Sequence, residues 1–145
     1  MTRQEFEKLV AEEFPGAIPE KFRARVENVA FLVEDEPSPE LRREENLGAH
    51  QTLLGHYRGI PHTARGEWYG VGATLPDTIT LFQLPIEEEA AELAAHEQGV
   101  EEGETSPVRA EYIRRVIRET IWHEVAHHFG MNEHEVRARE ADRGE

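Results

Sequence analysis

The sequence predicts an α+β fold in which a small sheet packs on helices, with the longest helix near the carboxyl terminus. Two observations lead to this class: three short segments have the composition or alternation of strands, and segments near both ends carry apolar residues at helical spacing. A chain of 145 residues is long enough to bury one core but too short for two ordinary ones. We therefore expect one domain over residues 1–145.

The amino-terminal part is expected to form two helices and a strand. Thr2 followed by Glu5 has the pattern of a capping box, and apolar residues then recur at helical spacing until the Pro-Gly pair at 15–16, which should end the first helix. Pro19 suits the first turn of a second, short helix. Residues 29–33 are all apolar and predict a buried strand.

The middle of the chain is expected to supply two more strands and an acidic helix. Residues 53–57 and 78–82 have strand character, and a long Gly-rich loop at 59–77 separates them. Between residues 87 and 104 there are eight glutamates and no lysine or arginine, around an Ala-rich centre. This composition indicates a solvent-facing helix that frays at its glycines.

The longest predicted helix begins with Ser106 as its cap and Pro107 at its first position. The apolar residues that follow lie on two adjacent stripes, which indicates a helix buried over most of its circumference. Its arginines should form an exposed side that pairs with the acidic segment before it. Gly130 is a natural end to the helix, and residues 133–142 can form a last short one.

Composition limits the partners and the kinds of site. The formal net charge of -14 would repel a phosphate backbone, so we expect no nucleic-acid partner. No segment approaches the roughly 18 apolar residues of a membrane span, and the first residues lack the apolar region of a signal peptide. We therefore expect a cytoplasmic protein without a membrane partner. The chain has no cysteine, so any metal site must use histidine and carboxylate.

Residues 123–127 have the pattern His-Glu-x-x-His within the long predicted helix. Residues four apart in a helix are about 40° apart around the axis and about 6 Å along it, so His123 and His127 can share a zinc ion. Glu124 lies about 100° further round, where it can reach a water on that ion and act as general base. His128 also points about 100° away from His127 and is expected to pack beside the site.

A third zinc ligand is expected just beyond the helix. Catalytic zinc usually has three protein ligands and one open position for water. Gly130 in a left-handed conformation would end the helix and let the chain turn back, so that Glu133 approaches the ion. Glu133 is the expected third ligand. His134 is the next candidate, and Glu135 and Glu140 stay open.

These residues carry a resemblance to known proteins. The pattern His-Glu-x-x-His-x-x-Gly-x-x-Glu over residues 123–133 resembles the short-spacer zinc motif of the metzincin-like clan, with an acid where metzincins usually have a third histidine. More closely, His-His-Phe-Gly at 127–130, preceded by the segment 76–82, is similar to a bacterial family of minimal zincin-like, possible metallopeptidase domains once catalogued as a domain of unknown function.

The resemblance implies a zincin-like α+β fold with a small mixed sheet. It also implies a zinc ion bound by two histidines and an acid, with Glu124 as the catalytic base. The substrate would be a peptide or protein, which in zincins commonly lies extended along an edge strand. Residues 78–82 are the candidate for that strand.

Two other functions stay compatible with the sequence. One is a non-catalytic zinc domain, in which the ion ties the carboxyl-terminal tail to the long helix and contributes folding energy. The other is an acidic interaction module that keeps the scaffold without metal and binds a basic partner through residues 87–104. Tyr57 and Tyr112 are candidates for stabilising an oxyanion, but the sequence places neither phenol.

Overall fold

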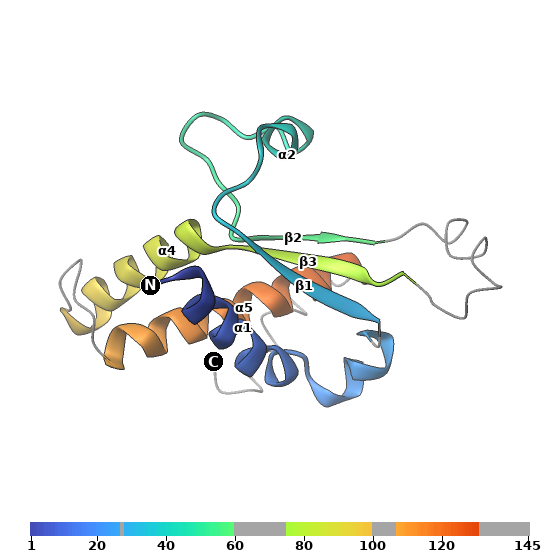
Figure 1. Ribbon diagram of the computed structural model, residues 1–145, viewed down its shortest axis with the longest axis horizontal. Helices are drawn as coiled ribbons and strands as arrows, with labels where there is room; N and C mark the ends of the chain where they lie inside the picture. Colours follow the sequence, from blue (N-terminus) through green and yellow to red (C-terminus); the bar gives the residue numbers. More distant parts are fainter. Residues whose placement is uncertain (27, 60–74, 100–106, 131–145) are drawn as a thin grey trace.

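The structure confirms the predicted fold class. The computed structural model describes residues 1–26, 28–59, 75–99 and 107–130 (Figure 1). Over these ranges a three-stranded sheet lies on a layer of helices, and the longest helix is the last. The buried apolar side chains form one hydrophobic cluster drawn from both layers. The assignment of 1–145 to a single domain stays a prediction.

The sheet is mixed, as expected, and has the strand order β1-β3-β2. β1 (Val29–Glu34) runs parallel to β3 (Asp77–Phe82), while β2 (Gly55–Arg58) runs antiparallel to it. The segment that we expected at the edge is therefore the central strand, with both of its sides already paired. Hydrophobic alternation identified the strand, but its position in the sheet depends on long-range pairing. The edge strand that contacts the last helix is β2.

Side chains of the sheet alternate between a face that meets the helices and an open face. On the helix side, Ile79 and Leu81 of β3 are fully buried, and their register partners on β2 are Tyr57 and Gly55. On β1, Leu32 faces the open side with 49% of its surface exposed, so this strand is buried on one face only. The predicted buried strand is thus less buried than expected, because among the described residues the helices cover one face of the sheet.

A segment around α2 (Pro39–Glu44) projects from the open face of the sheet (Figure 1). Two contacts join it to β2: Arg58 Nη2 lies 3.5 Å from Glu44 Oε2, and His56 Nδ1 lies 3.9 Å from Glu45 Oε1. The Arg58–Glu44 pair is exposed, and an exposed ion pair stabilises a fold by at most about 1 kcal/mol. We infer that they orient the segment over β2 without being essential for the fold.

The first helix, α1 (Arg3–Ala17), begins as predicted, with the Thr2 hydroxyl accepting a hydrogen bond from the Glu5 backbone N–H at 3.1 Å. It continues past Pro15 instead of ending there. Proline removes one backbone donor, but Ala17 is completely buried, and its packing outweighs that loss. A 3₁₀ helix (Glu20–Val26) follows, close to where the second short helix was expected.

The acidic helix, α4 (Gln83–Gln98), follows β3 without a loop and begins earlier than expected. One of its faces is buried and carries Ile86, Ala90 and Ala94, so only the side rich in glutamate faces solvent. It ends at Gly99, one of the glycines at which fraying was expected, and the φ of this residue, 67°, is left-handed. The expectation of a purely solvent-facing helix missed this alanine-rich face.

The last helix, α5 (Pro107–His128), contacts α1, α4 and the strands β2 and β3 (Figure 1). Trp122 in its carboxyl-terminal half is completely buried, and the centroid of its ring lies 5.5 Å from that of Phe22. This agrees with the predicted burial of most of the helix. Ser106, the predicted cap, lies outside the described residues, as do most of the loop 59–77 and the predicted helix 133–142. No helix in the described ranges is long and apolar enough to cross a bilayer.

Among the described residues, arginines of α5 pair with α1 as well as with the acidic helix. Arg115 does reach α4, with Nη1 lying 3.1 Å from Glu97 Oε2. Arg114 and Arg118 instead pair with Glu13 of α1, each at 3.3 Å. The sequence identified the basic side of the helix, but only packing decided which neighbour it meets.

Gly55 allows β2 and α5 to approach closely. A Cβ atom at this position would lie 2.7 Å from Thr120 Cγ2 and 3.2 Å from the Thr80 carbonyl oxygen, distances that require the two elements to separate. Gly55→Ala should therefore destabilise the protein by about 1 to 3 kcal/mol, measured by urea unfolding.

Gly16→Ala is the matched control for this substitution. A Cβ at Gly16 meets nothing within 4 Å, and the residue lies in a helix, so alanine should stabilise by roughly 0.5 to 1 kcal/mol. Thr120→Ser should recover part of the Gly55→Ala loss, since it removes the methyl group that clashes. Equal effects of the two alanine substitutions would contradict the close packing of β2 on α5.

Candidate metal centre

The last turns of α5 bring the two predicted histidine ligands together. The ring centroids of His123 and His127 lie 6.0 Å apart, and the rings are tilted by 59°. Two imidazoles that bind one ion through nitrogens at about 2.0 to 2.1 Å have centroids roughly 5 to 6 Å apart. The separation therefore fits two ligands of one tetrahedral ion, with a small rotation of the side chains.

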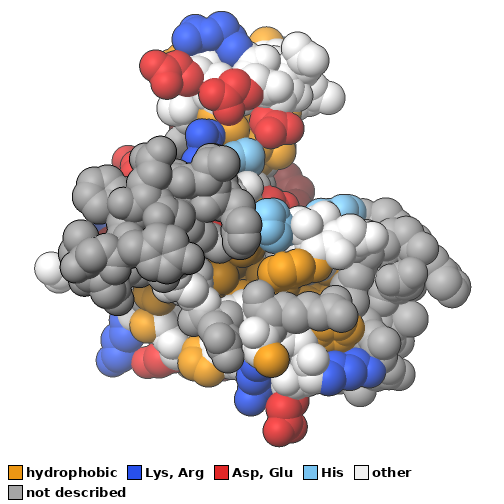
Figure 2. Space-filling model, turned by 90° about the vertical axis from the view of Figure 1, so that its right-hand side faces the viewer, with side chains coloured by type: hydrophobic (Ala, Val, Ile, Leu, Met, Phe, Trp, Pro, Cys, Tyr) orange, Lys and Arg blue, Asp and Glu red, His pale blue; other side chains and the backbone are white. Residues whose placement is uncertain are grey.

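The histidine pair lies where the helix reaches the surface. His123 is half-buried and His127 is exposed. In Figure 2, which looks at this end of the molecule, histidine side chains gather between the α2 segment at the top and the helical body below. A cavity of about 320 Å³ opens here, and His56, His127 and His128 all line it. An ion bound by the pair would be accessible to water and to a substrate.

Glu124 is held by the edge strand. Its Oε1 accepts a hydrogen bond from the backbone N–H of Tyr57 at 3.1 Å. Burial raises the pKa of Glu124, while the Tyr57 hydrogen bond and the nearby histidines act in the opposite direction and Glu45 adds to the rise. The net effect is a pKa above the ordinary value of 4.5. Once deprotonated, such a carboxylate has a strengthened tendency to take up a proton, which is the property of a general base.

Tyr57 contributes to the surroundings of the site in two further ways. Its ring stacks on that of His128, with centroids 3.9 Å apart, and its hydroxyl donates a 2.7 Å hydrogen bond to Asp77 Oδ2. His128 Nε2 lies 3.9 Å from the same Asp77 oxygen. His128 therefore packs beside the site as expected, and the Tyr57 phenol points to Asp77.

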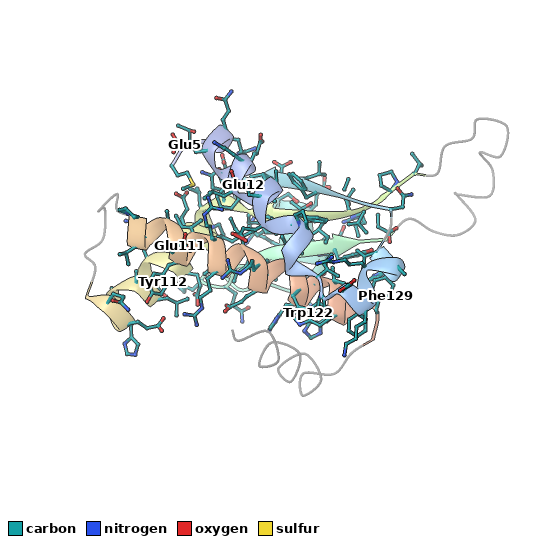
Figure 3. The ribbon with its side chains drawn as sticks, turned by 90° about the horizontal axis from the view of Figure 1, so that it is seen from below. Glu5, Glu12, Glu111, Tyr112, Trp122 and Phe129 are labelled. Carbon is teal, nitrogen blue, oxygen red and sulfur yellow. The ribbon has the colours of Figure 1, made fainter. Side chains whose placement is uncertain are left out.

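Tyr112 lies far from the histidine pair. Figure 3 labels it toward the beginning of α5, whereas Trp122 and Phe129 are at the other end. The second phenol considered for oxyanion stabilisation is thus distant from Glu124.

The role of β2 at the site could not be read from local patterns. The contact between Tyr57 and Glu124 joins residues 67 positions apart. One signal did exist, since a glycine inside a strand pattern, here Gly55, often marks a close approach of backbone to another element.

The predicted third ligand lies outside the described residues. Within the described part of the chain, no group of three histidine or acidic side chains is placed to hold a metal ion. Glu133, His134, Glu135 and Glu140 all follow the last described position. Gly130 has a φ of 80°, the left-handed conformation that was predicted to end the helix. The described residues therefore place the two candidate ligands His123 and His127 and the beginning of the turn, and Glu133 as third ligand stays a prediction.

The raised pKa of Glu124 predicts a pH-dependent gain in stability for Glu124→Gln in metal-free protein. Above about pH 4.5 the unfolded state releases this proton more readily than the folded state, so the wild type loses stability as pH rises through the higher folded pKa. Glutamine can still accept from Tyr57 but carries no charge. In chelator, Glu124→Gln should have the higher melting temperature at pH 7, and the difference should vanish near pH 4. A wild type that is more stable at pH 7 would contradict the desolvation of this carboxyl.

The chain was compared with known proteins. A family model described as zincin-like metallopeptidase matches residues 26–143. No curated protein matches the chain. The matched region includes every strand, α4 and the whole of α5 with its histidine pair, so it covers most of the chain. Membership implies a metal, typically zinc. The chain belongs to the zincin-like metallopeptidase family.

Proposed function

We propose that the protein is a zinc-dependent peptidase in which His123, His127 and Glu133 bind the ion and Glu124 is the general base. The observation that carries the proposal is the arrangement on α5, where two imidazoles at a separation suited to one ion flank a half-buried carboxylate. The family supports the coarser assignment as metallopeptidase-like.

The described residues supply the proton transfers of peptide hydrolysis. Zinc, when bound, supplies a Lewis acid that polarises the peptide carbonyl and lowers the pKa of a water to about 7. Glu124 accepts a proton from the attacking water and passes it to the leaving amine as the carbon–nitrogen bond breaks. Because the Tyr57 amide holds Oε1, the carboxylate has a fixed orientation and keeps its second oxygen for the proton.

The edge strand β2 offers a backbone on which a peptide can lie. The Leu54 carbonyl oxygen accepts a hydrogen bond from the Phe82 backbone N–H. In an antiparallel pair every second residue directs its backbone N–H and C=O to the neighbouring strand, so the backbone groups of Gly55 and Tyr57 point away from β3. Among the described strands, none pairs with the outer side of β2. A substrate that adds there as a further strand would pass Glu124. β2 thus replaces residues 78–82 as the candidate for the substrate-binding edge.

The metal site is tested first by its zinc content. Wild-type protein purified without a His tag should contain about one zinc per chain, and His127→Ala should lose it, because two remaining ligands hold the ion weakly. His96→Ala is the control, since this exposed histidine on α4 should leave the zinc content unchanged. Elemental analysis measures all three proteins. A wild type that takes up no zinc even when zinc is added would contradict the proposal and favour the acidic interaction module.

Catalysis is tested separately from metal binding. Glu124→Gln should retain its zinc but lower the rate of peptide hydrolysis by about 10²- to 10⁴-fold, since it cannot accept the proton. Glu111→Gln, an exposed substitution earlier on the same helix, should leave the rate unchanged. Cleavage of a peptide library by mass spectrometry provides the readout. Zinc-loaded wild type that cleaves no peptide would instead indicate a non-catalytic zinc domain.

A further inference from the structure

A second cavity, of about 300 Å³, adjoins the histidine cavity, which is the one lined by His56, His127 and His128; His123 is among the residues that line the second cavity. One face of α5 forms its floor, from Val116 to Glu124. The segment 52–55 that leads into β2 forms another wall, and Glu89 of α4 completes the lining. Glu124 and Gly55 line both cavities, so the two meet at the proposed base.

The lining of this cavity is mainly apolar. Leu53, Leu54 and Val116 line it, and Val116 is almost completely buried. Thr120 also lines it, with only 6% of its surface exposed. Its buried hydroxyl has no hydrogen-bond partner among the described residues. A buried hydroxyl without a partner is costly unless a ligand or water satisfies it. The apolar lining of the cavity suits a long aliphatic side chain.

Among the described residues that line the cavity, Glu89, Glu119 and Glu124 are acidic, His123 is the other titratable residue, and there is no lysine or arginine. Arg115 pairs with Glu119 at 3.0 Å but also with Glu97 at 3.1 Å, so a single guanidinium serves two carboxylates. Within the described ranges, Glu89 has no basic partner. The cavity thus has a negative potential, which attracts a cationic group and repels an anionic one.

We propose that this cavity binds a lysine or arginine side chain of the peptide substrate. Long basic side chains bury their methylene groups against apolar surface and keep the charged end at a polar rim. Here the methylene groups would lie against Val116 and Leu54, and the cationic end would reach Glu89 and Glu119. The proposal rests on the proposed peptidase function, since it requires a peptide at Glu124.

The position of the cavity along β2 also sets the side of cleavage. It lies at the amino-terminal end of β2, beside residues 52–55, whereas the histidine cavity extends to Tyr57. Antiparallel pairing is slightly more stable than parallel pairing, so we expect a peptide to run antiparallel to β2. Its chain then passes from the histidine cavity to the acidic one. The basic residue follows the broken bond, and the protein cleaves on the amino side of lysine or arginine.

The test compares two peptides that differ at one residue after the cleaved bond, lysine in one and its uncharged isostere norleucine in the other. Zinc-loaded wild type should have the higher kcat/KM for the lysine peptide. Glu89→Gln and Glu119→Gln should each lower the lysine-to-norleucine ratio by about fivefold or more. Glu88→Gln is the matched control, because it removes the same charge from the exposed side of α4 and should leave the ratio unchanged. Zinc content and melting temperature verify that each variant is folded.

Binding separates this proposal from the peptidase proposal. Fluorescence anisotropy with zinc-loaded Glu124→Gln measures peptide affinity without cleavage. The pocket would be supported if the lysine peptide binds more tightly than the norleucine peptide and if Glu89→Gln abolishes this difference. That holds even if wild type cleaves no peptide, and then only the peptidase function would fall. Cleavage without preference for a basic residue after the broken bond, or a ratio that both glutamine variants leave unchanged, would overturn the pocket while the peptidase function stands.

Discussion

The close packing of β2 on α5 is the constraint on which the candidate site depends. Gly55 lets the strand approach Thr120, and two residues later the Tyr57 amide reaches the carboxylate of Glu124. Any larger residue at 55 would separate the elements and lengthen that hydrogen bond. The same approach brings the walls of both cavities together at Glu124, so the geometry of the base and the shape of its surroundings have one common cause.

Electrostatics at the site follow from placing carboxyl groups in a half-buried position on a strongly acidic chain. Glu124 loses hydration, and Glu45 adds repulsion, so its charged form is disfavoured. The two histidines and the Tyr57 amide compensate only in part. A cation bound at the histidine pair would stabilise the charged form of Glu124 and so offset the cost of burying it. Metal binding and the burial of this carboxylate therefore favour each other.

Much of the fold could be predicted because its signals are local. Thr2 begins α1, Gly99 ends α4 and Gly130 follows α5 in the left-handed conformation, each for reasons that involve only near neighbours. What failed were statements about neighbours far apart in the sequence. β3 was expected at the edge but lies in the centre, and the pairing of Arg114 and Arg118 with Glu13 of α1 was not expected. Alternation and charge describe a surface, but do not say what covers it.

The sequence by itself determined that His123, Glu124 and His127 lie on one helix at a spacing that suits a shared ion, because helical geometry is fixed by local hydrogen bonds. Only the tertiary structure decided that β2 is the edge strand beside them, that Tyr57 holds the carboxylate, and that Glu89 and Glu119 face a common cavity. These relations join residues from separate elements, and they exist only once the core has fixed how the sheet and the helices pack.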